Sequence, residues 1–218
     1  MQIGVLGGTG PAGAALSVRL ASVGYDVVIG SRSAERAAEI CEDLAGKWPG
    51  RELRLAGADN ATAAGADVVV VSTPWDAAAS TAASVASSLD GKVVISIANA
   101  IAKVENELQP LLLPRGSVAA GVQAALPGAL VAATLHHVPA RELGAVDAPV
   151  EGDVLVCSDH PEATKQTAEI VDRIPGLRAL DAGRLSNAAA VEAFTSVLLQ
   201  LNIRYKTRAA VRFTGIRT

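Results

Sequence analysis

The sequence has few aromatic residues, only two cysteines and no long uninterrupted apolar run. Aromatic residues make up 3% of the 218 positions, and Cys41 and Cys157 form neither a metal motif nor a disulfide framework. Asp, Arg or Pro interrupts each apolar stretch before it reaches the roughly 18–20 residues that a membrane-spanning helix needs. We therefore expect no metal site, no membrane span and a reducing, cytoplasmic environment.

A large excess of charge is also missing. The net charge is −3, the sequence pI is about 5.6 and charged residues make up 19% of the chain, so general nucleic-acid binding is not expected. No basic leader precedes the first apolar strand pattern, which argues against a signal peptide. What remains is a chain that is 50% hydrophobic, rich in Ala, Val and Leu, and long enough for one sizeable core.

Strand-like and helix-like segments alternate through the first half of the chain. Such alternation predicts a parallel sheet with right-handed crossovers, whose strands are covered by helices on both faces. We therefore predict an α/β, Rossmann-type doubly wound parallel sheet. The expected strands are 2–7, 26–30, 52–57, 67–72 and 92–96, and the expected helices are 11–22, 34–47, with Ser33 as N-cap, and 76–88.

The pattern loosens past residue 114. We expect strands at 130–135, 153–157 and 177–180, a helix at 161–173, and helical spacing of apolar residues from 191 to 201. The change of pattern alone suggests two domains, a Rossmann-type domain at 1–128 and a smaller α/β domain at 129–218.

A glycine-rich turn follows the first strand. Gly8, Gly10 and Gly13 match G-x-G-x-x-G between a strand and a helix, which is the context that makes this motif specific for dinucleotides. The glycines allow a tight turn, close backbone approach to a pyrophosphate and close packing of helix on strand. The helix N-terminus offers free N–H groups to the anion. We expect the whole turn to bind the cofactor, including Thr9, Pro11 and Ala12.

The end of the second strand favours NADP(H) over NAD(H). An NAD site usually has Asp or Glu there to hold the ribose 2′-hydroxyl. This chain has Ser31, Arg32 and Ser33, followed one turn later by Arg36. A guanidinium and hydroxyls bind a 2′-phosphate, which a carboxylate would repel. The alternative is that Arg32 and Arg36 are solvated charges at a helix end.

Two further strand ends predict the nicotinamide pocket. Thr73, Pro74 and Trp75 follow the strand at 67–72, and ligands of open parallel sheets collect at the carboxyl ends of strands. Trp75 is equally suited to direct contact and to a role as a lid or interface residue. The segment 96–100, which follows the next strand, should also border the nicotinamide, and it includes Ala98, Asn99 and Ala100.

Segments spread over nearly the whole chain resemble one family, the coenzyme F420:NADP oxidoreductases, which use a deazaflavin coenzyme. The similar segments are GGTGPAG, SRSAER, STPWDAA, LHHVPAREL and LRALDAGRLSNAAAVEAFT. The resemblance implies reversible hydride transfer between the nicotinamide C4 and the deazaflavin C5, with NADP(H) and F420 as the two reactants. It also favours a homodimer.

The resemblance assigns individual residues. Thr9, Gly10, Ser31, Arg32 and Arg36 would bind the NADP phosphates. His136 and Val138 would line the shared pocket, with Val138 against the deazaflavin, and Ala140 would lie near the nicotinamide. Some archaeal members carry Pro- and Val-rich sequence where this chain has residues 97–100, a segment that touches the deazaflavin in the family. Lys also occurs in the family where this chain has Arg36.

Hydride transfer between two cofactors needs positioning more than side-chain chemistry, so we assign no general acid or base. His136 and His137 are the candidates near the predicted site, and the alternative is that they only donate or accept hydrogen bonds. His160 precedes a helix and is expected at the surface.

The C-terminal segment leaves two questions open. No Asp or Glu follows Glu192, whereas five basic residues do: Arg204, Lys206, Arg208, Arg212 and Arg217. They would attract the acidic tail of the deazaflavin, complete a subunit contact, or simply complement a helix end. The apolar stripe at 191–201 fits core packing and a dimer interface equally.

Two other functions compete with the leading hypothesis. One is an NADP-dependent reductase of a small imine or carbonyl compound. The other is a sensor that binds NADP(H) without turnover. The two C-terminal segments of the resemblance argue against a sensor, because a sensor needs no pocket for a second cofactor.

Overall fold

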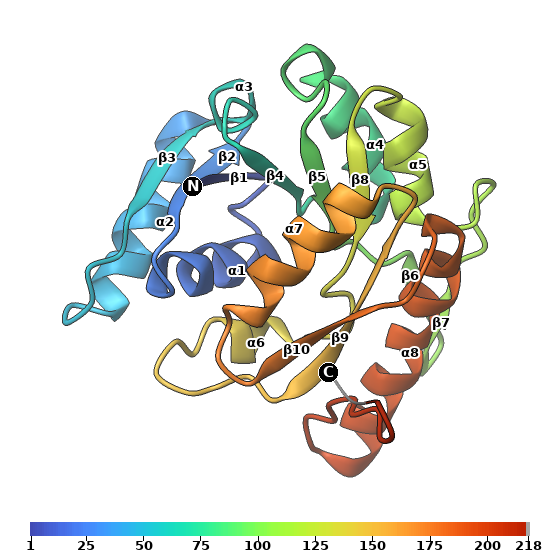
Figure 1. Cartoon of the computed structure of the whole chain (residues 1–218). Coiled ribbons are helices and arrows are strands. Elements are labelled where there is room, and N and C mark those ends of the chain that lie inside the picture. Colours follow the sequence, from blue (N-terminus) through green and yellow to red (C-terminus); the bar gives the residue numbers. More distant parts are fainter. Residues whose placement is uncertain (217–218) are drawn as a thin grey trace.

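The computed structural model describes residues 1–216 and follows the predicted alternation closely in the first half of the chain (Figure 1). The helix predicted at 34–47 has those bounds, and the Ser33 side chain caps it by accepting a hydrogen bond from the Arg36 amide at 3.1 Å. The elements are β1 (Gln2–Leu6), α1 (Pro11–Ser22), β2 (Asp26–Ser31), α2 (Ala34–Lys47), β3 (Leu55–Asp59), α3 (Asn60–Ala63), β4 (Val68–Val71), α4 (Trp75–Ala83) and β5 (Val93–Ser96).

Several short elements, most of them in the second half of the chain, were not predicted from periodicity. The antiparallel hairpin of β6 and β7 and the helices α3, α5 and α6 have four to eight residues each, too few to show a clear period. The elements are β6 (Ile101–Val104), β7 (Glu107–Pro110), α5 (Val118–Ala125), β8 (Leu130–Ala133), α6 (Ala140–Leu143), β9 (Gly152–Ser158), α7 (Pro161–Asp172), β10 (Leu177–Asp181) and α8 (Ala188–Tyr205).

One eight-stranded sheet runs through the molecule in the order β10-β9-β8-β5-β4-β1-β2-β3. All neighbouring pairs are parallel, as predicted, except β8 and β9, which are antiparallel. Because the chain turns back after β8, strand β9 begins at the edge where β8 ends. The division at residue 128 stays a prediction, and β8, the first strand beyond it, pairs with β5 in the same sheet.

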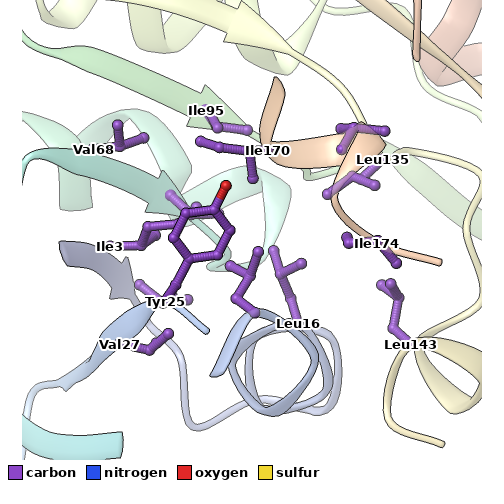
Figure 2. Packing of buried hydrophobic residues seen from close by; sticks show 14 of the residues in the cluster. Ile3, Leu16, Tyr25, Val27, Val68, Ile95, Leu135, Leu143, Ile170 and Ile174 are labelled. Carbon is purple, nitrogen blue, oxygen red and sulfur yellow. The ribbon is translucent and has the colours of Figure 1, made fainter. Parts of the chain in front are cut away.

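Alternating strand residues build a core on each face of the sheet. The core on one face includes Ile3 and Val68 together with residues of α1, α2, α6 and α7, and the core on the other includes Leu6 and Val69 with residues of α3, α4, α5 and α8. Figure 2 shows Leu16 of α1 and Ile170 of α7 pointing toward strand residues of the first core. The doubly wound architecture is therefore confirmed.

Both cysteines are free and poorly suited to redox chemistry. Cys157 is buried and Cys41 half-buried, and burial raises the pKa of each thiol to about 11. The thiolate, which is the reactive form, is therefore a minor species at neutral pH. Separately, none of the helices in residues 1–216 is long and apolar enough to cross a membrane.

Candidate functional site

A cleft of about 940 Å³ lies at the carboxyl ends of β1, β2, β4 and β5. Strand β1 pairs with β2 on one side and with β4 on the other, so the chain reverses its direction of travel across the sheet there. Ligands of doubly wound sheets bind at such a switch point. The predicted residues that line the cleft are Thr9, Gly10, Pro11, Ala12, Ser31, Arg32, Thr73, Pro74, Trp75, Ala98 and Asn99.

Gly8 and Gly13 lie behind the cleft and set the distance between α1 and the sheet. A Cβ on Gly13 would be 2.6 Å from Ser72 Oγ and 2.7 Å from Gly8 Cα, and one on Gly8 would be 2.8 Å from the Val5 oxygen. Any side chain would therefore push α1 away from β1. These two glycines therefore allow close packing of helix on strand. They do not line the cleft, and the cofactor contact expected of them stays a prediction.

The N-terminus of α1 is open toward the cleft. Its N-cap is Gly10, no side chain of the described residues caps it, and the first turn contains no acidic residue. Pro11 at the first helical position has no N–H to donate, while the following amides keep theirs. The α1 N-terminus thus provides free N–H donors and the positive end of a helix dipole, which fit a pyrophosphate.

Ser31 and Arg32 line the cleft at the end of β2, but Arg36 does not. The Arg36 guanidinium forms an ion pair with Glu39 at 2.9 Å, and its side chain is 57% exposed. Ser33 is occupied as the cap of α2 and also donates a hydrogen bond to Glu35 at 2.8 Å. Of the residues predicted to bind a 2′-phosphate, Ser31 and Arg32 therefore line the cleft and Arg36 does not, and the phosphate-binding role stays a prediction for all three.

Several cleft residues escaped the sequence reasoning. Asn60 follows β3, and its Oδ1 accepts a hydrogen bond from the Gly7 amide at 3.2 Å, so the strand-end rule applied to β3 would have found it. Leu199 of α8 has no such signal, because only the fold brings this helix to the cleft. The other unpredicted lining residues are Gly7, Ser72, Ala77, Ser80, Thr81, Ser84 and Ile101.

His136 is buried and lies next to Asn99, which lines the cleft. Its backbone oxygen accepts a hydrogen bond from Asn99 Nδ2 at 2.8 Å, and both ring nitrogens are buried without a partner in residues 1–216. Burial lowers the pKa of the imidazole to about 3, so it is neutral at pH 7 and cannot act as an imidazolium acid. His137 instead pairs through Nε2 with the Asp153 carbonyl at 2.8 Å.

The residue before His136 has an unusual backbone. Leu135 is in the left-handed region with φ of 59°, although its side chain is branched and buried in the first core. Such a conformation costs roughly 1–3 kcal/mol and persists only where the surroundings impose it. It turns the chain after β8 so that the His136 carbonyl faces Asn99.

The remaining predicted residues do not line the cleft. The backbone oxygen of Ala100 accepts a hydrogen bond from the Leu111 amide at 2.8 Å, which closes the base of the hairpin of β6 and β7. Val138 borders a separate small cavity of about 10 Å³, and Ala140 begins α6. His160, expected at the surface, is partly buried, and its Nε2 lies 3.2 Å from Gln123 Oε1.

Two residues of the basic C-terminal segment have carboxylate partners. Arg208 lies 3.5 Å from Glu142, and Arg212 lies 3.7 Å from Glu151. Their charge is partly neutralised within this chain. Arg217 lies outside the described residues.

The chain is similar to known proteins over its whole length, in sequence and in fold. A family model described as coenzyme F420-dependent NADP oxidoreductase matches residues 2–100. The F420-dependent NADP reductase of Methanocaldococcus jannaschii is 37% identical over 222 residues, which cover 100% of this chain and 97% of that protein. The enzyme of that name from Methanothermobacter marburgensis is 36% identical, with 99% of each chain covered. A solved structure from Arthrobacter, described as a candidate F420-dependent NADP reductase, has a TM-score of 0.81 at 24% identity and 99% coverage of both chains.

Proposed function

The chain belongs to the family of coenzyme F420-dependent NADP oxidoreductases, and we propose that it transfers a hydride reversibly between NADP(H) and F420. The balanced reaction is NADPH + F420 + H⁺ ⇌ NADP⁺ + reduced F420, with the hydride passing between the nicotinamide C4 and the deazaflavin C5. The observation that carries this proposal is the cleft at the switch point, which joins an open helix N-terminus to Ser31 and Arg32.

The residues of this chain bind and align the two reactants. The α1 N-terminus suits the pyrophosphate, and Ser31 and Arg32 suit the 2′-phosphate. Ala98 is small enough to let two rings stack closely, while Trp75 and Leu199 contribute apolar wall that excludes water. Because His136 is neutral at pH 7, we do not assign it as the acid that supplies the proton consumed when F420 is reduced.

The test is an absorbance assay of F420 reduction with NADPH and with NADH. We expect bleaching of the deazaflavin band to be much faster with NADPH. In the Arg32→Ala variant the KM for NADPH should rise by roughly ten- to a hundred-fold, because one charge-assisted contact to the 2′-phosphate is lost. The KM for NADH should change little, since NADH has no 2′-phosphate.

Arg36→Ala is the comparator. Its guanidinium is exposed and paired with Glu39, so we expect a smaller rise in the KM for NADPH than in the Arg32 variant. Equal use of NADH and NADPH by the unaltered protein would contradict the assignment of the phosphate site. Binding of NADPH without bleaching would retire F420 as the second substrate, and NADPH oxidation with an imine or carbonyl compound would then identify a different reductase.

We propose further that two copies of the chain pair through α8. Phe194, Val197, Leu201 and Tyr205 recur at helical spacing and are 39%, 50%, 37% and 69% exposed, whereas Val191 and Leu198 of the same helix are buried. The stripe predicted at 191–201 thus divides into a core face and an exposed face. An exposed apolar face at this spacing is suited to a self-complementary helix pair about a two-fold axis.

A charged residue at the centre of the exposed face should separate the copies. We expect the unaltered protein to elute at twice the mass of 22.1 kDa, and the Val197→Asp variant at the monomer mass. Light scattering after gel filtration measures both. Leu112→Asp is the control, because Leu112 is fully exposed outside the stripe. A monomeric unaltered protein would refute the dimer.

The cellular compartment stays a prediction. The low-reactivity thiols of Cys41 and Cys157 are compatible with a reducing cytoplasm, which is the location we propose.

A further inference from the structure

Asn99 presents a hydrogen-bond acceptor of fixed orientation at the cleft. Its Nδ2 donates to the His136 carbonyl at 2.8 Å, and a carbonyl can pair only with the amino half of the amide. The orientation of the side chain is therefore settled by chemistry. Its Oδ1 is left buried without a partner in the part of the chain that the structure describes, although Asn99 lines the cleft.

Thr73 supplies a second unpartnered group at the end of the neighbouring strand. Its Oγ1 is likewise buried and without a hydrogen-bond partner among residues 1–216, and Thr73 lines the same cleft. Strands β4 and β5 pair in register up to Val71 and Ser96, so the segments that carry Thr73 and Asn99 leave the sheet side by side. The Thr73 methyl group faces Gly7, which leaves the hydroxyl as the polar branch.

The two groups complement one another chemically. The Asn99 oxygen can only accept a hydrogen bond, whereas the Thr73 hydroxyl can donate one. An amide group, in which a carbonyl lies beside an N–H, would satisfy both together. Because buried polar atoms in folded proteins nearly always have partners, this pairing favours a ligand over a structural explanation.

We propose that Asn99 and Thr73 recognise an amide group on a ring bound in the cleft, with Asn99 accepting from its N–H and Thr73 donating to its carbonyl. The proposal rests on the proposed function. That function supplies two sources of the group, the carboxamide of the nicotinamide and the imide edge of the deazaflavin. Asn99 is thus a specificity-determining residue for one of the two rings.

The experiment removes the N–H from the ligand rather than from the protein. One arm compares NADP⁺ with its 3-acetylpyridine analogue, in which a methyl group replaces the amino group, and the other compares F420 with an analogue methylated at the imide nitrogen. Dissociation constants are measured by calorimetry for the unaltered protein and for Asn99→Leu. We expect the unaltered protein to bind the analogue of one arm roughly ten-fold more weakly than its parent, because the Asn99 oxygen would be left buried and unpaired.

In Asn99→Leu that ratio should fall to about one. The variant also loses the bond to His136, but this structural damage weakens parent and analogue alike and cancels in the ratio. Discrimination in the NADP⁺ arm identifies the carboxamide, and discrimination in the F420 arm identifies the imide. Thr73→Val should weaken parent and analogue equally, since both keep the carbonyl.

An unaltered protein that binds parent and analogue equally in both arms would overturn the proposal, and so would an unchanged ratio in Asn99→Leu. The first of these results does not depend on the variant, because it uses only the unaltered protein. The F420 assay with NADPH separates this failure from failure of the proposed function, since hydride transfer would still be observed.

Discussion

Replacing Arg19 with methionine is expected to lower the free energy of unfolding by about 4 kcal/mol. Arg19 lies on α1 and is only 1% exposed. Its Nε donates to the Leu143 carbonyl at 2.8 Å, and its Nη2 donates to Glu142 and Ala145 carbonyls at 2.9 and 2.8 Å. Methionine fills much of the volume but donates nothing, so carbonyls at the end of α6 lose their partner in a buried place.

Urea denaturation followed by circular dichroism measures the effect. Arg36→Met is the matched control, since its ion pair with Glu39 lies at the surface of α2 and should contribute less than about 1 kcal/mol. A loss below about 1 kcal/mol in the Arg19 variant would mean that water replaces the guanidinium at these carbonyls. Because Arg19 joins α1 to α6, the variant should also lose affinity for F420 if Val138, just before α6, contacts the deazaflavin.

Arg19 illustrates what the sequence could not predict. Helix α1 was expected from its glycine turn and its apolar residues, but an arginine within an apolar helix gives no sign of its partners. Those partners are backbone carbonyls more than 120 residues away along the chain. The α2 helix is the opposite case, because its cap Ser33 and its apolar period are both local. Features set by neighbouring residues could therefore be predicted from the sequence. The hydrogen-bond partners of a buried side chain could not, when those partners lie far away along the chain.

The candidate site divides in the same way. Ser31, Thr73 and Asn99 were predicted because each follows a recognisable parallel strand, and strand ends gather at one edge of the sheet. Leu199 reaches the cleft through the packing of α8, for which the sequence holds only a helical period. The antiparallel turn between β8 and β9 also lacked a signal, since both strands are apolar and no tight hairpin joins them.

Glu192 should make the stability of the fold depend on pH. It lies on α8, is 5% exposed, and accepts hydrogen bonds from the Val118 and Ala119 amides at 2.8 and 3.1 Å. Burial raises the pKa of its carboxyl group from 4.5 to about 7, against the opposing effect of the two N–H bonds. The folded protein therefore holds this proton up to a higher pH than the unfolded chain does.

The sign follows from that difference. The stabilisation that the proton on Glu192 gives to the folded state is complete below the unfolded pKa of 4.5. It is lost as the pH rises through the folded pKa of about 7. Between pH 5 and pH 8 we expect the free energy of unfolding of the unaltered protein to fall by about 2–3 kcal/mol relative to Glu192→Gln. The glutamine cannot titrate, so any fixed cost of the substitution cancels when the difference is followed against pH.

Urea denaturation of both proteins at half-unit steps of pH measures this difference. The contributions of His136 and His137 to the pH dependence are the same in both proteins and cancel in the difference. Cys157, whose thiol pKa is about 11, does not ionise in this range. Glu162→Gln is the control, because Glu162 is exposed in the first turn of α7. Its free energy of unfolding should follow the same pH dependence as that of the unaltered protein. A difference that stays flat would mean that the Glu192 carboxylate is ionised throughout. The two amides at the N-terminus of α5 would then stabilise the charge by more than burial penalises it, and the contact between α8 and α5 would be a permanent ionic cap.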